Sequence, residues 1–420
     1  MFTFLHASDI HLDSPLLKLD HYEGAPVDAL RRATRRALEN LVELAIIKEV
    51  DFVLITGDLY DGDWKDYNTG LYFVSQMSKL REAGISAYII TGNHDAASKT
   101  TKTLRLPDGI HLFPTDKPDT VCLDDMDIAI HGQGFLKPAV KKDLSTSYPQ
   151  AVSGCFNIGM LHTCATGREG HEPYAPCTID GLRSKGYDYW ALGHIHKHEV
   201  LREDPLIIFP GNIQGRSIRE TGPKGCVIVD VDDRGYATAD FHSLDVIRWL
   251  LCKIDVTHTS DGYDVVDSVC RQLEEFLENN EDMPLVARVE ISGASPAHEL
   301  LAADPERWTN EIRSSAVDFS GGRIWIEKVK LRTKLPDKNE FPEHLDGPVG
   351  ELLQFFDEIQ SDPNRLKSLG ETFNDLWKKL PRELQATTRI SSNGSGWLAD
   401  MLDNVRPMLI NRLMSKQDSL

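Results

Sequence analysis

The sequence has few cysteines, and they are not arranged for cross-linking or metal binding. The seven cysteines are scattered, odd in number and include no Cys-x-x-Cys pair. This disfavours a disulfide framework or a thiolate zinc site and fits a reducing compartment. Long apolar runs are also absent, and stretches such as Val53–Ile55 are far too short to span a bilayer. The first residues lack a basic stretch followed by an apolar one, so we expect no signal peptide, no membrane association and a cytoplasmic protein.

Positive charge is in deficit as well. The chain has 46 Lys and Arg residues against 65 Asp and Glu residues, a formal net charge of −19. This disfavours a nucleic-acid partner, because affinity for nucleic acid comes largely from neutralising phosphates. Bound metal ions or a partner protein could still supply positive charge locally, so the composition does not exclude such a partner.

A chain of 420 residues can form one large domain and one or two small ones. Residues 2–91 alternate between β-rich and helical patterns, which predicts parallel strands with right-handed crossovers. Short strands continue to residue 231, so we expect a second, mixed sheet packed on the first, with helices outside. The predicted fold is α/β (α+β) in four parts: a main domain (1–245), a small α+β capping domain (246–334), a linker (335–348) and a helical C-terminal region (349–420). In the last part, the apolar pattern predicts amphipathic helices over residues 349–380 and 397–414.

Five short polar clusters lie where predicted strands end, which is where open α/β sheets bind ligands. They contain carboxylate, amide and imidazole groups and no thiolate, the donors that a hard or borderline divalent metal prefers. Two of them place ligands two residues apart, so that on an extended segment both side chains point the same way. The candidate ligands are Asp9, His11, Asp58, Asn93, His162, His194 and His196.

Seven ligands are more than one ion needs once water is added, so we predict two ions with Asp58 as the bridging carboxylate. Two divalent ions would leave the site net positive and attract a phosphate. A water between the ions would be hydroxide near neutral pH and would attack phosphorus in line. We expect His94 to protonate the leaving oxygen, and Asp95 to orient the His94 imidazole.

The five clusters, in this order, resemble the signature of the calcineurin-like metallophosphoesterase superfamily, in particular the DNA-repair exonucleases of the bacterial SbcD and YhaO type. The resemblance covers residues 1–244 with specific motifs, and the rest only by domain order. The motifs are Phe4 to Asp13, Thr56 to Asp61, Ile90 to Asp95, Tyr189 to His196 and Pro210 to Arg216.

The resemblance implies a metallophosphoesterase β-sandwich and a manganese-dependent nuclease that acts on DNA, with iron also suited to these ligands. It implies the seven metal ligands above and His94 as the catalytic histidine. It also implies an SMC-like ABC ATPase with a coiled coil, bound through the C-terminal helices, and makes a homodimer plausible. Archaeal and eukaryotic relatives carry a second histidine where this chain has Asp61, which puts in question any step that uses that histidine.

Two arginines, Arg216 and Arg219, follow the last metal cluster and are candidates for holding substrate phosphate. A solvated surface arginine is an equally good interpretation of either one. The leading hypothesis is a DNA exonuclease, with endonuclease activity also allowed. The alternatives are a phosphatase or cyclic-nucleotide phosphodiesterase with the same two-metal site, and an inactive scaffold of the same fold.

Overall fold

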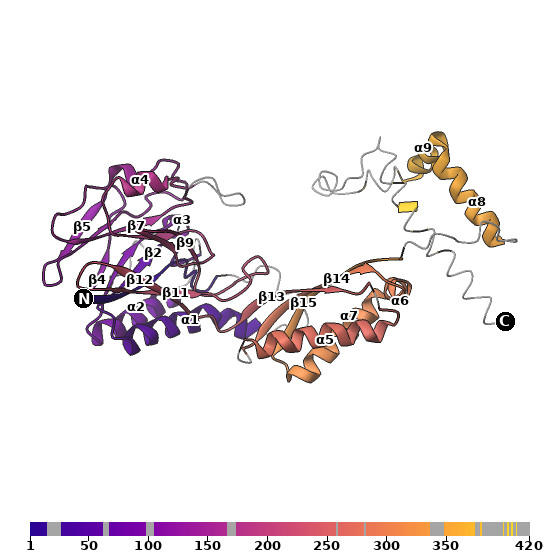
Figure 1. Ribbon diagram of the computed structural model, residues 1–420, viewed down its shortest axis with the longest axis horizontal. Helices are drawn as coiled ribbons and strands as arrows, with labels where there is room; N and C mark the ends of the chain where they lie inside the picture. The colour runs from indigo at the N-terminus through magenta and orange to yellow at the C-terminus, as the bar shows by residue number, and fades with distance from the viewer. Residues whose placement is uncertain are drawn as a thin grey trace. The chain divides into compact units, whose positions relative to one another are not determined.

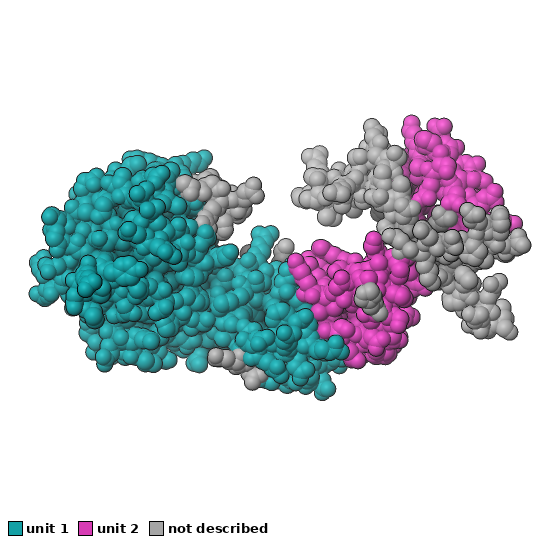
Figure 2. Space-filling model, viewed as in Figure 1, with its two compact units in different colours: residues 1–252, 270–289, 313–329 teal, residues 253–269, 290–312, 330–420 magenta. Residues whose placement is uncertain are grey.

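The computed structural model describes residues 1–14, 27–61, 67–97, 105–165, 174–257, 259–280, 283–336 and 348–373, with single residues at 379, 398, 401, 402, 405 and 409. These form two compact units, residues 1–252, 270–289 and 313–329 in the first and 253–269, 290–312 and 330–420 in the second (Figure 2). The four-part division from the sequence stays a prediction. Among the described helices, none has the length and apolar character needed to cross a membrane.

The first unit contains two six-stranded mixed sheets (Figure 1). In the first sheet four parallel strands are extended by two antiparallel ones, in the order β12 (Ala237–Ser243), β11 (Gly225–Val231), β1 (Phe2–Ala7), β2 (Phe52–Thr56), β3 (Ser86–Ile90), β4 (Ile110–Leu112). The second sheet has four parallel strands between two antiparallel edges, in the order β5 (Asp119–Leu123), β6 (Ile128–Gly132), β7 (Phe156–His162), β8 (Tyr189–Gly193), β10 (Leu206–Phe209), β9 (Glu199–Glu203).

Strand β2 shows why the two sheets stack. All five of its residues are buried, so the strand is apolar on both faces. Phe52 and Leu54 belong to the core between the sheets, together with Ile130 and Ile158 of the second sheet. The alternate residues of β2 pack against the two helices that cover the outer face of the first sheet, α1 (Val27–Ile47) and α2 (Tyr67–Glu82) (Figure 1).

The outer face of the second sheet has a core of its own. Trp190, Leu192 and Phe209 pack there beneath the long loops after β6 and β7, the 3₁₀ turn Ser145–Ser147 and the short helix α4 (Ile179–Arg183). Each sheet is therefore covered on both faces. The sandwich flanked by helices that the sequence predicts is confirmed.

A third, three-stranded sheet contains β13 (Arg248–Asp255), β14 (Leu285–Ala294) and β15 (Ile324–Lys334). The backbone bonds from Arg248 N to Pro284 O and from Val256 N to Ser292 O run in the same direction along both strands, so β13 and β14 are parallel. The connecting helices are α5 (Gly262–Glu278), α6 (His298–Ala303) and α7 (Pro305–Ser320). The predicted small α+β domain is therefore present.

The C-terminal region differs from the sequence-based expectation. The apolar pattern predicts one helix over residues 349–380, but the structure has two, α8 (Pro348–Ser361) and α9 (Pro363–Thr372). Pro363 cannot donate a backbone hydrogen bond, and Asp362 instead caps α9 by accepting from Asn364 N at 2.8 Å. Most of the predicted linker and of the second predicted helix, residues 397–414, lie outside the described residues.

We expect Gly159→Ala to destabilise the sandwich. Gly159 lies in β7 opposite Trp190, and a Cβ at this position would come within 2.4 Å of the indole ring. Because the ring is fully buried, the strain should lower the free energy of unfolding by about 1–3 kcal/mol in urea denaturation. The double-mutant cycle with Trp190→Leu provides the control. If the penalty is the same in the Trp190→Leu background, the clash with Trp190 is not its cause.

Candidate metal centre

The candidate ligands come together at one edge of the sandwich, although they are far apart in the sequence. Each follows or ends a parallel strand, so the carboxyl ends of strands from both sheets meet there. The first sheet contributes Asp9 and His11 after β1, Asp58 after β2, and Asn93 at the start of α3 (Asn93–Ala97). The second sheet contributes His162, the last residue of β7, and His194 and His196 after β8.

The carboxylates and imidazoles form two groups that Asp58 joins. In each group the potential ligand atoms lie within 4.8 Å of one another: Asp9, His11 and His196 form the first, and Asp58, His162 and His194 the second. A third group, which overlaps both, contains His11, Asp58 and His94. Asp58 Oδ2 lies 3.8 Å from His11 Nε2 and 3.5 Å from His162 Nε2. Its other oxygen, Oδ1, accepts from His94 N at 2.9 Å. One oxygen of Asp58 is therefore held by the backbone while the other lies between the two groups.

The backbone at this edge is tightly constrained. Four of the ligands have left-handed backbone conformations, with φ values of 52° at Asp9, 45° at His11, 51° at Asp58 and 99° at His194. Residues other than glycine rarely adopt such conformations, and they occur most often at functional sites. We conclude that the fold holds these ligand residues in conformations that their own backbones do not favour.

Two glycines allow the strand ends to approach closely. A Cβ at Gly92 would lie 2.2 Å from Asp58 Oδ1, and one at Gly193 would lie 2.0 Å from Thr56 O. Any larger residue at either position would push the loops apart. These contacts explain physically why glycine directly precedes Asn93 and His194.

The orientations of two imidazoles are fixed by hydrogen bonds on the nitrogen that faces away from the site. His162 Nδ1 donates to Thr56 O at 2.9 Å, so Nε2 carries a lone pair in the neutral ring. That nitrogen faces Asn93 Oδ1 at 3.0 Å and Asp58 Oδ2 at 3.5 Å. In the neutral ring, lone pairs of nitrogen and oxygen would point at one another, so these atoms require either a proton on Nε2 or a cation between them.

The first group shows the same arrangement. His196 Nδ1 bonds to Glu220 Oε1 at 2.7 Å, while its Nε2 lies 3.2 Å from His11 Nε2 and 3.4 Å from Asp9 Oδ1. Asp9 Oδ1 is buried and has no hydrogen-bond donor within the described chain. A buried carboxylate oxygen of this kind requires an explanation, and a metal ion is the simplest one.

The charges of the site also favour cations. Burial opposes ionisation of Asp58, but the neighbouring His162 imidazole outweighs it and lowers the pKa of the carboxyl to about 2. Burial opposes the charged form of His162, yet Asp58 raises the pKa of that ring to about 9. The carboxylates are therefore ionised at neutral pH, and they attract positive charge into a buried site. Oxygen and nitrogen donors in this number fit two divalent ions, with Asp58 shared.

The predicted role of Asp95 needs correction. The sequence predicts that Asp95 orients His94, but this residue is buried and accepts from Tyr60 N at 3.0 Å and Gly92 N at 2.9 Å. Burial and the charge of Asp58 raise its pKa to about 7. Asp95 therefore links the start of α3 to the segment that follows β2. Its hydrogen bonds are with backbone N–H groups and not with the His94 ring.

The carboxylate that contacts His94 is Asp61. His94 Nδ1 lies 2.7 Å from Asp61 Oδ1, and this hydrogen bond raises the pKa of His94. Burial favours protonation of Asp61, but hydrogen bonds with His11 and His94 hold its pKa well below its ordinary range. The His94 side chain is 40% exposed, so part of the ring remains accessible while Nδ1 is bound to Asp61.

Glu220 is a functional candidate that the sequence analysis missed. Besides His196 Nδ1, its carboxylate accepts from Arg216 N at 2.7 Å and from Asn212 Nδ2 at 3.0 Å. It is the one acidic residue between Pro210 and Gly225, directly after the last metal cluster. That isolation is the signal that could have identified it.

The two arginines proposed as phosphate ligands have different surroundings. Arg216 lies at the site, but its guanidinium already donates to Ser14 Oγ and Asp61 Oδ2, both at 3.2 Å, and to Glu220 Oε1 at 3.4 Å. Arg219 is exposed on the same loop. Arg216 therefore lies at the candidate centre, where its guanidinium bridges the carboxylates of Asp61 and Glu220.

Comparison with known proteins agrees with this geometry. A family model described as calcineurin-like phosphoesterase matches residues 2–198, and one described as the metallophosphoesterase YhaO middle domain matches residues 249–334. The uncharacterized metallophosphoesterase YhaO of Bacillus subtilis is 34% identical over 387 residues, 90% of this chain and 87% of that protein. The fold and the centre therefore define a calcineurin-like metallophosphoesterase with a His/Asp metal site. Within that class, the chain belongs to the YhaO family.

More distant relatives have a named role. The DNA double-strand break repair protein Mre11 of Thermoplasma acidophilum is 27% identical over 327 residues, 74% of this chain and 82% of that protein. The protein of the same name from Sulfurisphaera tokodaii is 26% identical and covers 73% of this chain and 77% of its own length.

We expect Asp58→Asn to weaken binding at both metal positions together. The carboxylate lies between the two groups, and the amide would bring one oxygen, one N–H₂ group and no charge. Metal content after dialysis, measured by mass spectrometry, should fall well below two ions per chain. Asp180→Asn, at a side chain that is 89% exposed, is the matched control. Retention of one tightly bound ion would show that Asp58 serves a single position.

We expect Glu220→Gln to reduce metal affinity by about 10–100-fold, the usual effect of changing the partner of a ligating histidine. Glutamine keeps an acceptor for His196 Nδ1 but removes the negative charge that makes the imidazole more basic. Isothermal titration calorimetry with Mn²⁺ would measure the dissociation constant of each variant. Glu203→Gln, at an exposed side chain, is the control. Unchanged affinity would mean that Glu220 only organises its loop.

Proposed function

We propose that this protein hydrolyses phosphodiester bonds in DNA as an exonuclease, with endonuclease activity also allowed, and acts in DNA repair. The observation that supports the proposal most directly is the pair of ligand groups joined by Asp58. Both Mre11 relatives are named for DNA double-strand break repair, which supports DNA as the substrate. We propose Mn²⁺ as the ion, because the donors are imidazole and oxygen without thiolate, and Fe²⁺ as the alternative.

When bound, two divalent ions neutralise a phosphate and lower the pKa of a water so that it can attack phosphorus. Asp9, His11 and His196 would hold one ion and Asn93, His162 and His194 the other, with Asp58 shared. The hydrogen bonds that His162 Nδ1 donates to Thr56 O and that His196 Nδ1 donates to Glu220 Oε1 orient the ligand nitrogens before any ion arrives. The chain's own contribution is therefore a fixed arrangement of the oxygen and nitrogen atoms that would bind the ions.

His94 is proposed to donate a proton to the leaving oxygen. Its Nδ1 is bound to Asp61, so the proton for transfer would come from Nε2, at the accessible edge of the ring. Asp61 stabilises the charged imidazole until the phosphorus–oxygen bond breaks. Asp61 would thereby take the orienting role that the sequence pattern predicts for Asp95.

The proposed substrate contacts are Arg216 and Arg219. Arg219 is exposed and could contact a phosphate directly. Arg216 would have to exchange one of its carboxylate partners for the phosphate. If it left Asp61, that carboxylate would keep His94 as its partner, and if it left Glu220, that carboxylate would keep His196. Both arginines could form the charge-assisted bonds that phosphate oxygens accept.

For partners we propose DNA, a second copy of the chain, and an SMC-like coiled-coil ABC ATPase bound through the C-terminal helices. Helices α8 and α9 pack around Phe356, Ile359 and Leu366, yet Phe355 remains 54% exposed. An exposed aromatic residue on an amphipathic helix is typical of a surface that binds a partner helix.

We expect the protein with Mn²⁺ to degrade labelled duplex or single-stranded DNA, and His94→Ala to lower kcat by about 10²–10⁴-fold at unchanged metal content. The control is His242→Ala, at a half-buried histidine on β12. Cyclic nucleotides and p-nitrophenyl phosphate are tested in parallel. Efficient turnover of cyclic nucleotides with DNA untouched would replace the proposal by a small-molecule phosphodiesterase. No turnover of any substrate, with metal bound and the ATPase partner added, would indicate an inactive scaffold.

A further inference from the structure

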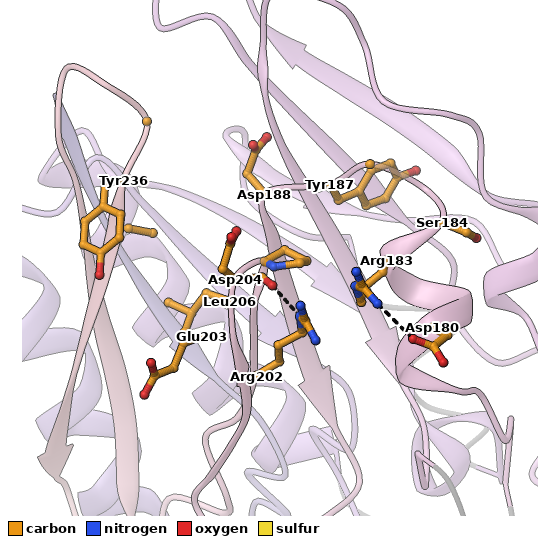
Figure 3. Close-up of a pocket in the computed structure, with 14 residues that line it drawn as sticks. Asp180, Arg183, Ser184, Tyr187, Asp188, Arg202, Glu203, Asp204, Leu206 and Tyr236 are labelled. Atoms are coloured by element: carbon orange, nitrogen blue, oxygen red, sulfur yellow. Dashed lines mark hydrogen bonds and ion pairs between the residues drawn. The ribbon is translucent and has the colours of Figure 1, made fainter.

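Two cavities in the described part of the first unit differ strongly in character. One, of about 740 Å³, lies at the amino-terminal ends of β8 and β10 (Figure 3). Its two arginines are already engaged, Arg183 with Asp180 and Arg202 with the carbonyl oxygen of Asp204 (Figure 3). The described residues that line it therefore offer no free cation to a ligand, and the cavity lies at the opposite ends of these strands from the metal centre.

The other cavity has a volume of about 360 Å³ and lies at the carboxyl-terminal end of β6. One wall is the turn between β4 and β5, residues 115–118, and the other is the segment 133–147 that follows β6. We call it the basic pocket, because Lys117, Lys137 and Lys142 line it. The carboxyl ends of the neighbouring strands β7 and β8 carry the metal ligands, so the basic pocket and the centre lie on the same edge of the second sheet.

The charge of the basic pocket is opposite to that of the chain. Its three lysines are exposed, and within the described chain none of them has an ion-pair partner. Asp116 is the single acidic residue among the described residues that line the cavity. In a protein with a net charge of −19, three unpaired ammonium groups around one cavity form a local site for an anion.

The wall of the basic pocket lies one residue away from the metal centre. Gly134 lines the pocket, and a Cβ there would lie 2.3 Å from Thr91 Oγ1, two residues before Asn93. The next residue, Phe135, donates its backbone N–H to Thr91 O at 2.9 Å, and its ring packs edge-on against His162 at 5.4 Å between centroids. A single residue thus separates the pocket lining from a metal ligand.

A second feature of the pocket indicates a ligand rather than a solvated surface. Gln133, which lines the cavity, is only 5% exposed, and its Oε1 has no hydrogen-bond partner in the described chain. The amide Nε2 donates to Thr115 O at 3.3 Å, which leaves the oxygen as an unused acceptor. Buried acceptors are normally satisfied, so this oxygen suits a ligand with an O–H or N–H donor. The apolar rim at Leu136 and Pro118 suits the non-polar part of such a ligand.

We propose that the basic pocket is a phosphate subsite that holds a nucleic-acid strand next to the bond that is cut. A nucleotide unit of DNA combines an anionic phosphate, which matches the lysines, with an N–H donor on the base, which matches Gln133 Oε1. None of the described residues that line the pocket is aromatic, so it would hold the phosphate without stacking on bases. Every base carries an N–H group that Gln133 can accept from, so we expect no strong sequence preference. The inference rests on the proposed action on DNA, because only a polymer reaches the pocket and the metal centre together.

The test measures binding rather than cleavage, with EDTA present so that no DNA is cut. A fluorescent oligothymidylate is titrated with the wild-type protein and with the triple variant Lys117→Gln, Lys137→Gln, Lys142→Gln over a range of salt concentrations. Removal of one lysine–phosphate interaction should reduce the slope of log K against log salt by about 0.7, and removal of all three by about 2. A control triple variant, Lys48→Gln, Lys79→Gln, Lys328→Gln, removes the same charge at exposed positions elsewhere and should keep the wild-type slope.

Three results would overturn the inference. The two triple variants could show the same slope, or the wild-type protein could fail to bind the oligonucleotide even at low salt. Alternatively, dTMP could bind as tightly as the oligonucleotide and be weakened equally in the first variant, which would make the pocket a mononucleotide site. Wild-type nuclease activity with Mn²⁺ is assayed separately, so failure of the subsite and failure of the proposed function give different results.

Discussion

The structure depends on the burial of two ionised carboxylates, Asp9 and Asp58, at the point where the two sheets meet. Carboxylates in such a position are unfavourable unless positive charge and hydrogen-bond donors surround them. The protein provides imidazoles whose outer nitrogens are held by Thr56 O and Glu220, and backbone N–H groups that bind the remaining oxygens. That arrangement requires left-handed backbone conformations at four ligands. It also requires that Gly92 lie close to Asp58 and Gly193 close to Thr56 O.

The ligand set could be predicted from the sequence because each residue lies at the end of a recognisable strand. Because the strands are parallel and adjacent, their carboxyl ends lie at one edge of the sandwich. The structure brings all seven candidate ligands together there. The contacts of His94 were harder to predict. Asp95 is next to His94 in the sequence, whereas Asp61 is 33 residues away and meets it only in the folded chain. The spacing does not reveal that the Asp95 carboxylate already accepts hydrogen bonds from the backbone N–H groups of Tyr60 and Gly92. Glu220 lies in a loop with no regular pattern, so only its isolation among uncharged and basic residues identifies it.

The fold was predictable to a similar degree, and for similar reasons. Strands that are buried on both faces, such as β2 and β7, are short, largely apolar runs that end at glycine or polar residues, and such runs can be recognised in the sequence. The edge strands β9 and β12 were not predicted, because none of their residues is buried and both are rich in polar residues, so their sequences resemble loops. The predicted long C-terminal helix has an apolar repeat that continues across Asp362 and Pro363, where backbone chemistry rather than side-chain pattern ends the helix.

The distribution of ligands between the two sheets has a consequence for the stability of the whole domain. Asp9, Asp58 and Asn93 belong to the first sheet and His162, His194 and His196 to the second, so an ion at their junction cross-links the layers. A ligand that binds only the folded chain stabilises it by mass action, by about 2.7 kcal/mol at a hundredfold excess over its dissociation constant. Availability of the metal in the cell would therefore set how much of this protein survives proteolysis as well as how fast it works.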